Sequence, residues 1–344
     1  MNERSSRDMY RNNDYIYDAV VQLQELAGVT AEVESSRAEY DAIATIDNTQ
    51  FVVVSKSEIR ASNKGMVLNE INSTRTKTKK PIVAIAKFIA KDIAQELKDN
   101  GINYIDRAGN AYIKQGKLLV YITGQKAERP TVSNQSRAFQ ESGIKLVFQL
   151  LTQPDDLQLS YRSLAEKTGI ALGSVSIIMK ELEDLRFVVK TKNKRYLKNK
   201  TELLQRWVMA FNDVLRPRLL KKRFRFSNNE AYNKWQQLPL NEMPGRNIWG
   251  GEPGASILTK QLQPQNYTIY TDSGWQSIAS NLKLIPDNDG EVEILAIFWK
   301  EDETTNYKNI APTLIILAEL MGSGKERNIE TAKIITENEL QHIK

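Results

Sequence analysis

The segment around residues 143–187 most constrains the fold, because helical periodicity and turn signals follow one another there in a fixed order. Apolar residues repeat at helical spacing over Gly143–Leu151 and again over Gly173–Phe187. Between these runs, Ser160 stands where it can cap a second helix and Gly169 where it can end it. The turn Ile170–Leu172 then leads into the third helix. The pattern predicts three helices, the last two joined by a short turn.

A basic β-hairpin is predicted directly after the third helix. Residues 188–197 read Val-Val-Lys-Thr-Lys-Asn-Lys-Arg-Tyr-Leu, with a cationic tip at Lys192–Arg195. Three helices followed by such a hairpin are typical of a winged helix-turn-helix, which we expect over residues 136–200. The alternative is a plain three-helix packing unit whose hairpin only solvates the surface.

The two faces of the third helix differ in character. Val175, Ile178, Met179, Leu182 and Leu185 form the face that we expect in the core, whereas the opposite face of the first two turns holds Gly173, Ser176, Ile177 and Lys180. Small and polar side chains at the start of a helix allow close approach to the major groove. The candidate DNA-binding residues are Tyr161, Arg162, Ser174, Ser176, Ile177, Lys180, Lys190, Lys192, Lys194 and Arg195. Of these, Ser176, Ile177 and Lys180 are expected at base edges, and Tyr161, Arg162, Lys190, Lys192, Lys194 and Arg195 at phosphates.

Composition excludes several classes of chemistry. The chain has no cysteine, and its single histidine is His342, so disulfides, thiolate catalysis and a His-centred triad are excluded. No cofactor and no metal are expected. The segment Met1–Asn13 has no apolar core typical of a signal peptide, and the longest apolar run, near Leu314–Met321, is too short to cross a bilayer. We therefore expect a cytoplasmic protein without a membrane partner.

Positive charge is concentrated in two runs, although the net charge is only +6. Residues 186–200 hold seven Lys or Arg and no acid, and residues 216–225 hold six more. Clustered cations favour a polyanionic partner because binding releases counterions. The second run, interleaved with Phe224 and Phe226, either extends the DNA footprint or docks an acidic partner surface.

Residues 1–127 are predicted to form an α/β domain with some parallel strand pairing, because strand-like runs alternate with helical ones. Asn103–Ile113 is predicted to be a single strand and Arg75–Lys80 a basic loop. The domain's pattern is similar to a restriction-endonuclease core, which needs an Asp and a Glu-x-Lys to hold a metal. Asp41 and Lys56 match two of these positions, but Val54 fills the Glu position. An inactive nuclease-like scaffold is therefore expected, with an active nuclease as the alternative. Gln125–Gln135 is predicted to be a linker.

Residues 201–344 are predicted to form a C-terminal α/β domain with a final pair of helices. Its first helix is expected to run from Thr201 to about Leu215 and to stop before Pro217. Gly250–Glu252 resembles the start of a nucleotidyltransferase fold, but the metal-binding Asp residues do not follow; an inactive domain of that type and a Gly-rich turn of an unrelated domain stay open. Gly322–Lys325 lacks the Walker pattern and is interpreted as a helix-ending turn. Asp106 precedes Ala108–Asn110, where an Asx-type turn is favoured over a contact site.

Taken together, several motifs resemble the AbiEi-type antitoxin and transcriptional-regulator family of type IV toxin–antitoxin systems. They cover most of residues 100–335 in the family's order, and Pro253–Gly254 departs from the family's preference for small helix-forming residues. The stretches that carry the resemblance are Gly101–Ile113, the winged helix with Leu203–Trp207 and Leu215–Pro217, Trp249–Glu252, Ala255, Leu258–Thr259, Pro264, Ala318–Leu320 and Arg327–Ala332.

The resemblance implies a non-enzymatic autorepressor whose partners are double-stranded DNA and a nucleotidyltransferase-like toxin. From the residues themselves we infer a sequence-specific DNA-binding regulator. The rival class is a DNA-processing protein of a mobile element, in which the winged helix delivers a nuclease-like domain. A third class is a protein-binding module that neutralises a toxin without touching DNA. The sequence alone indicates neither the operator nor the oligomeric state.

Overall fold

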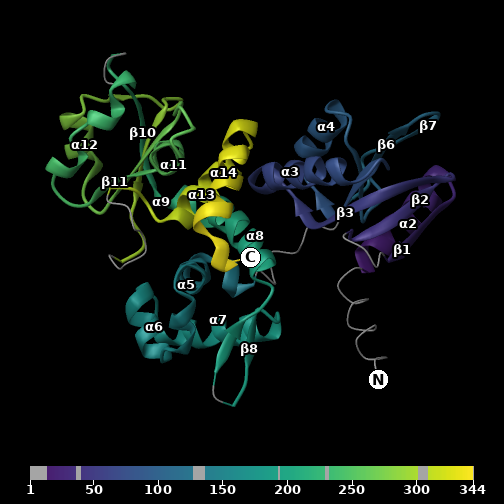
Figure 1. Cartoon of the computed structure of the whole chain (residues 1–344), viewed down its shortest axis with the longest axis horizontal. Coiled ribbons are helices and arrows are strands. Elements are labelled where there is room, and N and C mark those ends of the chain that lie inside the picture. The colour runs from purple at the N-terminus through teal and green to yellow at the C-terminus, as the bar shows by residue number, and fades with distance from the viewer. Residues whose placement is uncertain are drawn as a thin grey trace. The chain divides into compact units, whose positions relative to one another are not determined.

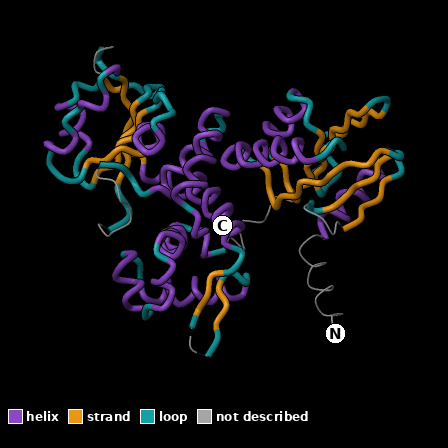
Figure 2. The backbone as a smooth tube through the Cα atoms, viewed as in Figure 1, coloured by secondary structure: helices purple, strands orange, loops and turns teal. Residues whose placement is uncertain are grey.

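A computed structural model describes residues 14–35, 40–126, 136–192, 194–228, 232–300 and 309–343. The chain divides into two compact units, residues 1–134 and 135–344 (Figure 1). Both combine helices with β-sheet, which agrees with the expected mixed class (Figure 2). In the described part of the chain, no helix has the length and apolar character needed to span a membrane. Most of the expected linker, residues 127–135, lies outside the described residues.

The first unit is built on a seven-stranded sheet in which the strands follow one another in sequence order. β3 pairs with β4, and β4 with β5, in parallel, whereas the remaining neighbours are antiparallel. The parallel pairing that the sequence predicted is therefore present. The strands are β1 (Ala31–Ser35), β2 (Ala42–Ile46), β3 (Thr49–Ile59), β4 (Ile82–Ile89), β5 (Asn103–Asp106), β6 (Ala111–Gln115) and β7 (Leu118–Ile122).

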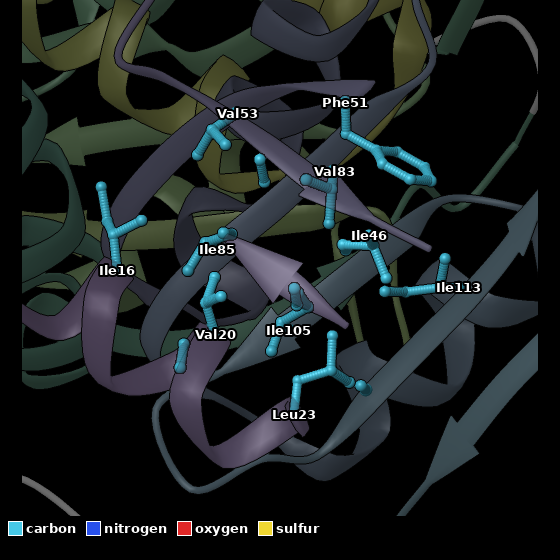
Figure 3. Close-up of a cluster of buried hydrophobic side chains, with 14 of the residues drawn as sticks. Ile16, Val20, Leu23, Ile46, Phe51, Val53, Val83, Ile85, Ile105 and Ile113 are labelled. Carbon is cyan, nitrogen blue, oxygen red and sulfur yellow. The ribbon is translucent and has the colours of Figure 1, made fainter. Parts of the chain in front are cut away.

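Helices cover both faces of this sheet, and the sheet separates two layers of apolar core. α2 (Asp14–Ala27) packs Ile16, Val20 and Leu23 against side chains of the central strands (Figure 3). α3 (Ala61–Lys77) and α4 (Lys91–Asp99) bury apolar side chains on the other layer. Side chains alternate between the faces along a strand, so β3 supplies both layers.

Two local predictions in this unit were wrong, and one strand was missed. The run Asn103–Ile113 forms two strands rather than one, because Asp106 closes a turn between them. The expected basic loop Arg75–Lys80 begins inside α3, which continues to Lys77. The strand β1 was not predicted at all; its sequence, Ala-Glu-Val-Glu-Ser, has only a weak apolar alternation.

The second unit begins with a helical region and a two-stranded hairpin. The third helix ends at Asp184 rather than Phe187, and Leu185 is its C-cap. The elements are η2 (Arg137–Phe139), α5 (Glu141–Thr152), η3 (Pro154–Gln158), α6 (Tyr161–Thr168), α7 (Leu172–Asp184), β8 (Val188–Lys190) and β9 (Arg195–Leu197).

A long helical segment connects this region to the second sheet. α8 (Lys200–Ala210) passes into a π-helical turn, η4 (Phe211–Leu215), and then into α9 (Arg216–Leu219). The helix was expected to stop before Pro217, and this was wrong. Pro217 lies within the first turn of α9, where the missing amide hydrogen costs little.

A five-stranded sheet with order β11-β12-β14-β10-β13 forms the rest of the second unit. β12 and β14 are parallel, and the other pairs are antiparallel. Its strands are β10 (Leu220–Arg225), β11 (Asn247–Gly250), β12 (Tyr267–Thr271), β13 (Ile285–Pro286) and β14 (Val292–Ala296). Its helices are η5 (Trp235–Gln237), η6 (Leu240–Glu242), α11 (Gly251–Thr259), α12 (Trp275–Asn281), α13 (Thr313–Gly322), α14 (Glu326–Glu339) and η7 (Gln341–Ile343).

An aromatic cluster joins the helical region to the rest of this unit. Trp207 of α8 is fully buried, stacks on Phe148 of α5 with ring centroids 5.8 Å apart, and donates its indole N–H to the Ile144 carbonyl at 2.9 Å. Phe298 packs on Phe148 at 5.3 Å, and a ring nitrogen of His342 lies 3.0 Å from the Leu151 carbonyl. Residues on both sides of position 200 therefore share one core.

Candidate nucleic-acid interface

The turn between α6 and α7 holds the two helices at a defined angle. The Ser160 side chain accepts a hydrogen bond from the Ser163 backbone N–H at 3.1 Å, which caps α6. Gly169 ends α6 in the left-handed conformation, with φ of 68°, where a side chain would be strained. Both residues have the roles that the sequence predicted for them. Ala171 then becomes the N-cap of α7, so the new helix starts after a two-residue turn.

α7 has one buried and one exposed face. Val175, Ile178, Met179 and Leu182 are buried, as the helical spacing predicted. Gly173, Ser176, Ile177 and Lys180 are exposed, and Ile177 leaves 46% of its surface accessible. Ser174 is half-buried and lies on the flank of the helix, between the buried and the exposed face. Three of the four candidate DNA-binding residues on α7, namely Ser176, Ile177 and Lys180, therefore lie together on its exposed face.

Gln158 anchors the β8–β9 hairpin to the start of α6, and sequence analysis missed it. Its side-chain amide donates to the Arg195 carbonyl at 2.6 Å and accepts from the Arg195 backbone N–H at 3.1 Å. The side chain thus pairs with the outer edge of β9 as a neighbouring strand would. At the tip, the Thr191 backbone N–H donates to the Lys194 carbonyl at 2.8 Å and closes the turn.

Arg195 is partly used within the protein. Its guanidinium donates to the Leu159 carbonyl and lies over the Tyr161 ring, 5.3 Å from the ring centroid. This contact holds Arg195 and Tyr161, two of the candidate phosphate-binding residues, against each other. A cation–π contact of this kind leaves the outer edge of the guanidinium available for a further hydrogen bond.

Five candidate cations are exposed and form no ion pair within the described residues: Arg162, Lys180, Lys190, Lys192 and Lys194. Lys190 and Lys194 line an open cleft of about 420 Å³ between the hairpin and the N-terminal end of α6. Helix N-termini favour anions because their first backbone N–H groups have no partner within the helix. The cleft is therefore suited to a negatively charged group. Its lining residues are Gln158, Leu159, Ser160, Tyr161, Lys190, Thr191, Lys194 and Arg195.

The second basic run behaves differently. Arg216 pairs with Glu293 and, at 3.0 Å, with Glu319. Arg223 also pairs with Glu293. Arg218 and Arg225 pair with Glu141 and Asp287, and Lys222 lies over the Trp275 ring at 4.8 Å. Most of this cationic run is therefore neutralised inside its own unit, which weakens both functions considered for it from sequence.

Residues of the family-like motifs meet in one buried polar network. The Glu252 carboxylate pairs with Arg327 and accepts hydrogen bonds from the Gln265 backbone at 2.7 Å and from Asn328 at 3.1 Å. Burial alone would raise the pKa of Glu252, but these donors outweigh it and lower the pKa to about 2. The network ties the start of α11 to α14.

Glu319 is the second buried carboxylate of this network and lies on the other side of α11. It is buried, accepts from the Gly251 backbone N–H at 2.7 Å and pairs with Arg216. Burial raises the pKa of Glu319 above its ordinary value. Pro253–Gly254, the departure from the family pattern, lie inside the first turn of α11, where a side chain at Gly254 would collide with Ile316. These motif residues hold α11, α13 and α14 together.

Two further sequence motifs have local structural roles. Asp106 accepts from the Ala108 and Asn110 backbone N–H groups at 3.0 and 2.9 Å, which confirms the Asx-type turn. Its pKa is raised by burial. Gly322–Lys325 joins α13 to α14, as a helix-ending turn should.

The two nuclease-like positions in the first unit are also held by neighbours. Asp41 accepts from the Ser55 backbone and side chain at 2.7 and 2.8 Å, and Lys56 pairs with Glu70 at 2.6 Å. Within the described residues, no group of three or more His, Asp or Glu side chains is placed to hold a metal ion.

Comparison with known proteins adds two family matches. The model of a family described as a transcriptional regulator, AbiEi antitoxin of a type IV toxin–antitoxin system, matches residues 196–341. A second family, described as the Firmicute plasmid replication protein RepL, matches residues 140–237. No curated protein and no solved structure matches the chain. Through residues 196–341 the chain is thus similar to the AbiEi antitoxin family of transcriptional regulators, as its motifs predicted.

Proposed function

We propose that this protein is a sequence-specific DNA-binding regulator that represses its own operon and acts as the antitoxin of a toxin–antitoxin pair in the cytoplasm. In this proposal residues 136–200 are a winged helix-turn-helix, with α7 as recognition helix and β8–β9 as wing. One observation carries it: α7 presents a face of small, apolar and cationic side chains beside a hairpin whose lysines form no ion pair with any residue that the structure describes.

Each part of this surface has a counterpart on duplex DNA. A helix fits the major groove, where Ser176 donates and accepts hydrogen bonds and Lys180 donates to guanine acceptors. Lys190 and Lys194 in the cleft, with Lys192 at the hairpin tip, are positioned for backbone phosphates. Phosphate contacts give affinity for any duplex, whereas α7 supplies the preference for one sequence.

Both family matches support DNA binding by the second unit. The AbiEi family is described as transcriptional regulators and antitoxins, and the RepL family as plasmid replication proteins. For the partner we propose a nucleotidyltransferase-like toxin encoded beside this gene, because the family resemblance implies one. Co-purification of the neighbouring gene product with the full chain tests that part of the proposal separately from DNA binding.

The test of DNA binding is fluorescence anisotropy with the protein's own upstream DNA and a scrambled duplex, at two salt concentrations. Lys180→Ala should cost about 1–3 kcal/mol on the cognate duplex and little on the scrambled one. Lys192→Ala should weaken both duplexes alike and reduce the salt dependence by about one phosphate contact. Lys333→Ala, which removes an exposed charge on α14, is the matched control. Equal losses on both duplexes for Lys180→Ala would show that α7 does not recognise base edges.

The RepL match favours a second candidate function, a DNA-processing protein of a mobile element. In that case the first unit is a nuclease-like domain delivered by the winged helix. Incubation of the full chain with supercoiled plasmid and Mg²⁺ or Mn²⁺ separates the two proposals. Under the regulator proposal the plasmid stays intact, whereas cleavage that disappears in Asp41→Ala would favour the nuclease.

A further inference from the structure

Large hydrophobic side chains are exposed at the candidate interface of the second unit. Within its described residues, the large hydrophobic side chains that are exposed are those of Leu172, Ile177, Val189 and Tyr196. Leu172 and Ile177 lie on α7 with 47% and 46% of their surface accessible, and the other two lie on the hairpin. Exposed hydrophobic side chains gathered on α7 and the adjoining hairpin indicate a binding surface.

Ile177 occupies the middle of the exposed face of α7. Helical geometry places Gly173 one turn before it and Lys180 one turn after it on the same face. No atom lies within 4 Å of a methyl group built on Gly173, so the space beside Ile177 is open. A flat ligand edge can therefore reach the Ile177 side chain.

The charges of the candidate interface favour DNA over a protein partner. Lys180 on α7, Arg162 on α6 and Lys190 on β8 are exposed and form no ion pair within the described residues. Protein interfaces deplete lysine around their apolar centre. A polyanion with an apolar group among its polar edges fits this surface better.

In the major groove of DNA, the apolar group on a base edge is the 5-methyl group of thymine. We propose that Ile177, with Leu172 at the start of the same helix, recognises thymine methyl groups, so that the operator carries A·T pairs under α7. This inference rests on the proposed DNA-binding function and specifies its substrate. Burial of one methyl group should contribute about fourfold to affinity.

The experiment begins with selection of duplexes by the full chain from a pool with a random central segment. The best selected duplex is then synthesised with each thymine replaced, one at a time, by deoxyuridine, which lacks only the 5-methyl group. Wild-type protein should lose about fourfold in affinity at one or two of these positions. Ile177→Ala should bind the thymine and deoxyuridine duplexes equally at one of them. Leu119→Ala, which shortens an exposed side chain on β7 of the first unit, should keep the full discrimination.

Each contrary result overturns the inference in a distinguishable way. If the protein selects a duplex but tolerates every deoxyuridine, the methyl contact is wrong and the proposed DNA-binding function stands. If discrimination persists in Ile177→Ala, another side chain makes the contact. If no duplex is selected, the inference and the proposed function fail together. If Ile177→Ala changes the sedimentation of the DNA-free protein, the apolar face is a self-association surface instead.

Discussion

Replacing Gly173 by alanine should stabilise the protein and weaken its binding to DNA. Gly173 lies in the first turn of α7, its φ is not in the left-handed region, and nothing lies within 4 Å of an added methyl group. The folded protein therefore has no steric need for glycine at this position. Alanine reduces the conformational entropy of the unfolded chain and favours the helix, which should raise the free energy of unfolding by about 0.4–1 kcal/mol.

The same methyl group should obstruct the duplex. If the groove wall approaches the backbone at Gly173, the collision should cost about 1–3 kcal/mol, or roughly 5- to 150-fold in Kd. The increase in stability corresponds to a rise of about 1–4 °C in Tm for a unit of this size. Calorimetry and fluorescence anisotropy on the selected duplex measure the two effects on one preparation.

Asn338→Ala is the matched control, because Asn338 is exposed on α14 and alanine raises helix propensity there too. It should raise Tm slightly and leave Kd unchanged. A Gly173→Ala protein that is more stable and binds as tightly as wild type would refute close approach of DNA to this face. A Gly173→Ala protein that is less stable than wild type would refute the claim that the fold has no steric need for glycine at this position.

Two further predictions concern the wing and the buried network. Gln158→Ala removes both hydrogen bonds to the backbone of Arg195. Loss of this anchor, worth roughly 1 kcal/mol, should weaken binding to the specific and the scrambled duplex alike, by about fivefold in Kd. It should also speed amide exchange in β9. For Glu252, the pKa is lowered from 4.5 to about 2, so the carboxylate stabilises the fold above pH 4.5 and this contribution is lost as the pH falls toward 2. The stability difference between wild type and Glu252→Gln, measured by urea unfolding, should therefore shrink by roughly 3 kcal/mol between pH 6 and pH 2; a constant difference would contradict the carboxylate's role.

Local sequence patterns predicted the features that depend on local physics. The spacing of Val175, Ile178, Met179 and Leu182 identified the buried face of α7, because burial on one side of a helix follows its period. The cap at Ser160 was likewise predictable from its side chain alone. The nuclease-like and nucleotidyltransferase-like domains and the DNA contacts stay predictions.

Features that depend on distant partners were not predictable from local sequence. Residues 216–225 looked like a free basic surface, but Arg216 finds Glu319 more than one hundred positions further along the chain. Gln158 meets Arg195 across 37 positions, and an isolated Gln in a polar segment gives no sign of strand-like pairing. Charge runs show where cations are placed in sequence, whereas ion pairing depends on the tertiary fold.

The two family matches overlap at the helix that carries the centre of the aromatic cluster. The match to the plasmid replication family ends at residue 237 and the match to the antitoxin family begins at residue 196, so both include α8. Trp207 on that helix is fully buried against Phe148 of α5, and burial of a Trp side chain of about 150–250 Å² contributes several kcal/mol. The candidate DNA-binding helices and the rest of the second unit therefore share a core to which this side chain contributes. Under the proposed function, a partner that binds the sheet region and shifts α8 would move α5, against which α7 packs, so we propose this as a physical route from toxin binding to a change in operator affinity.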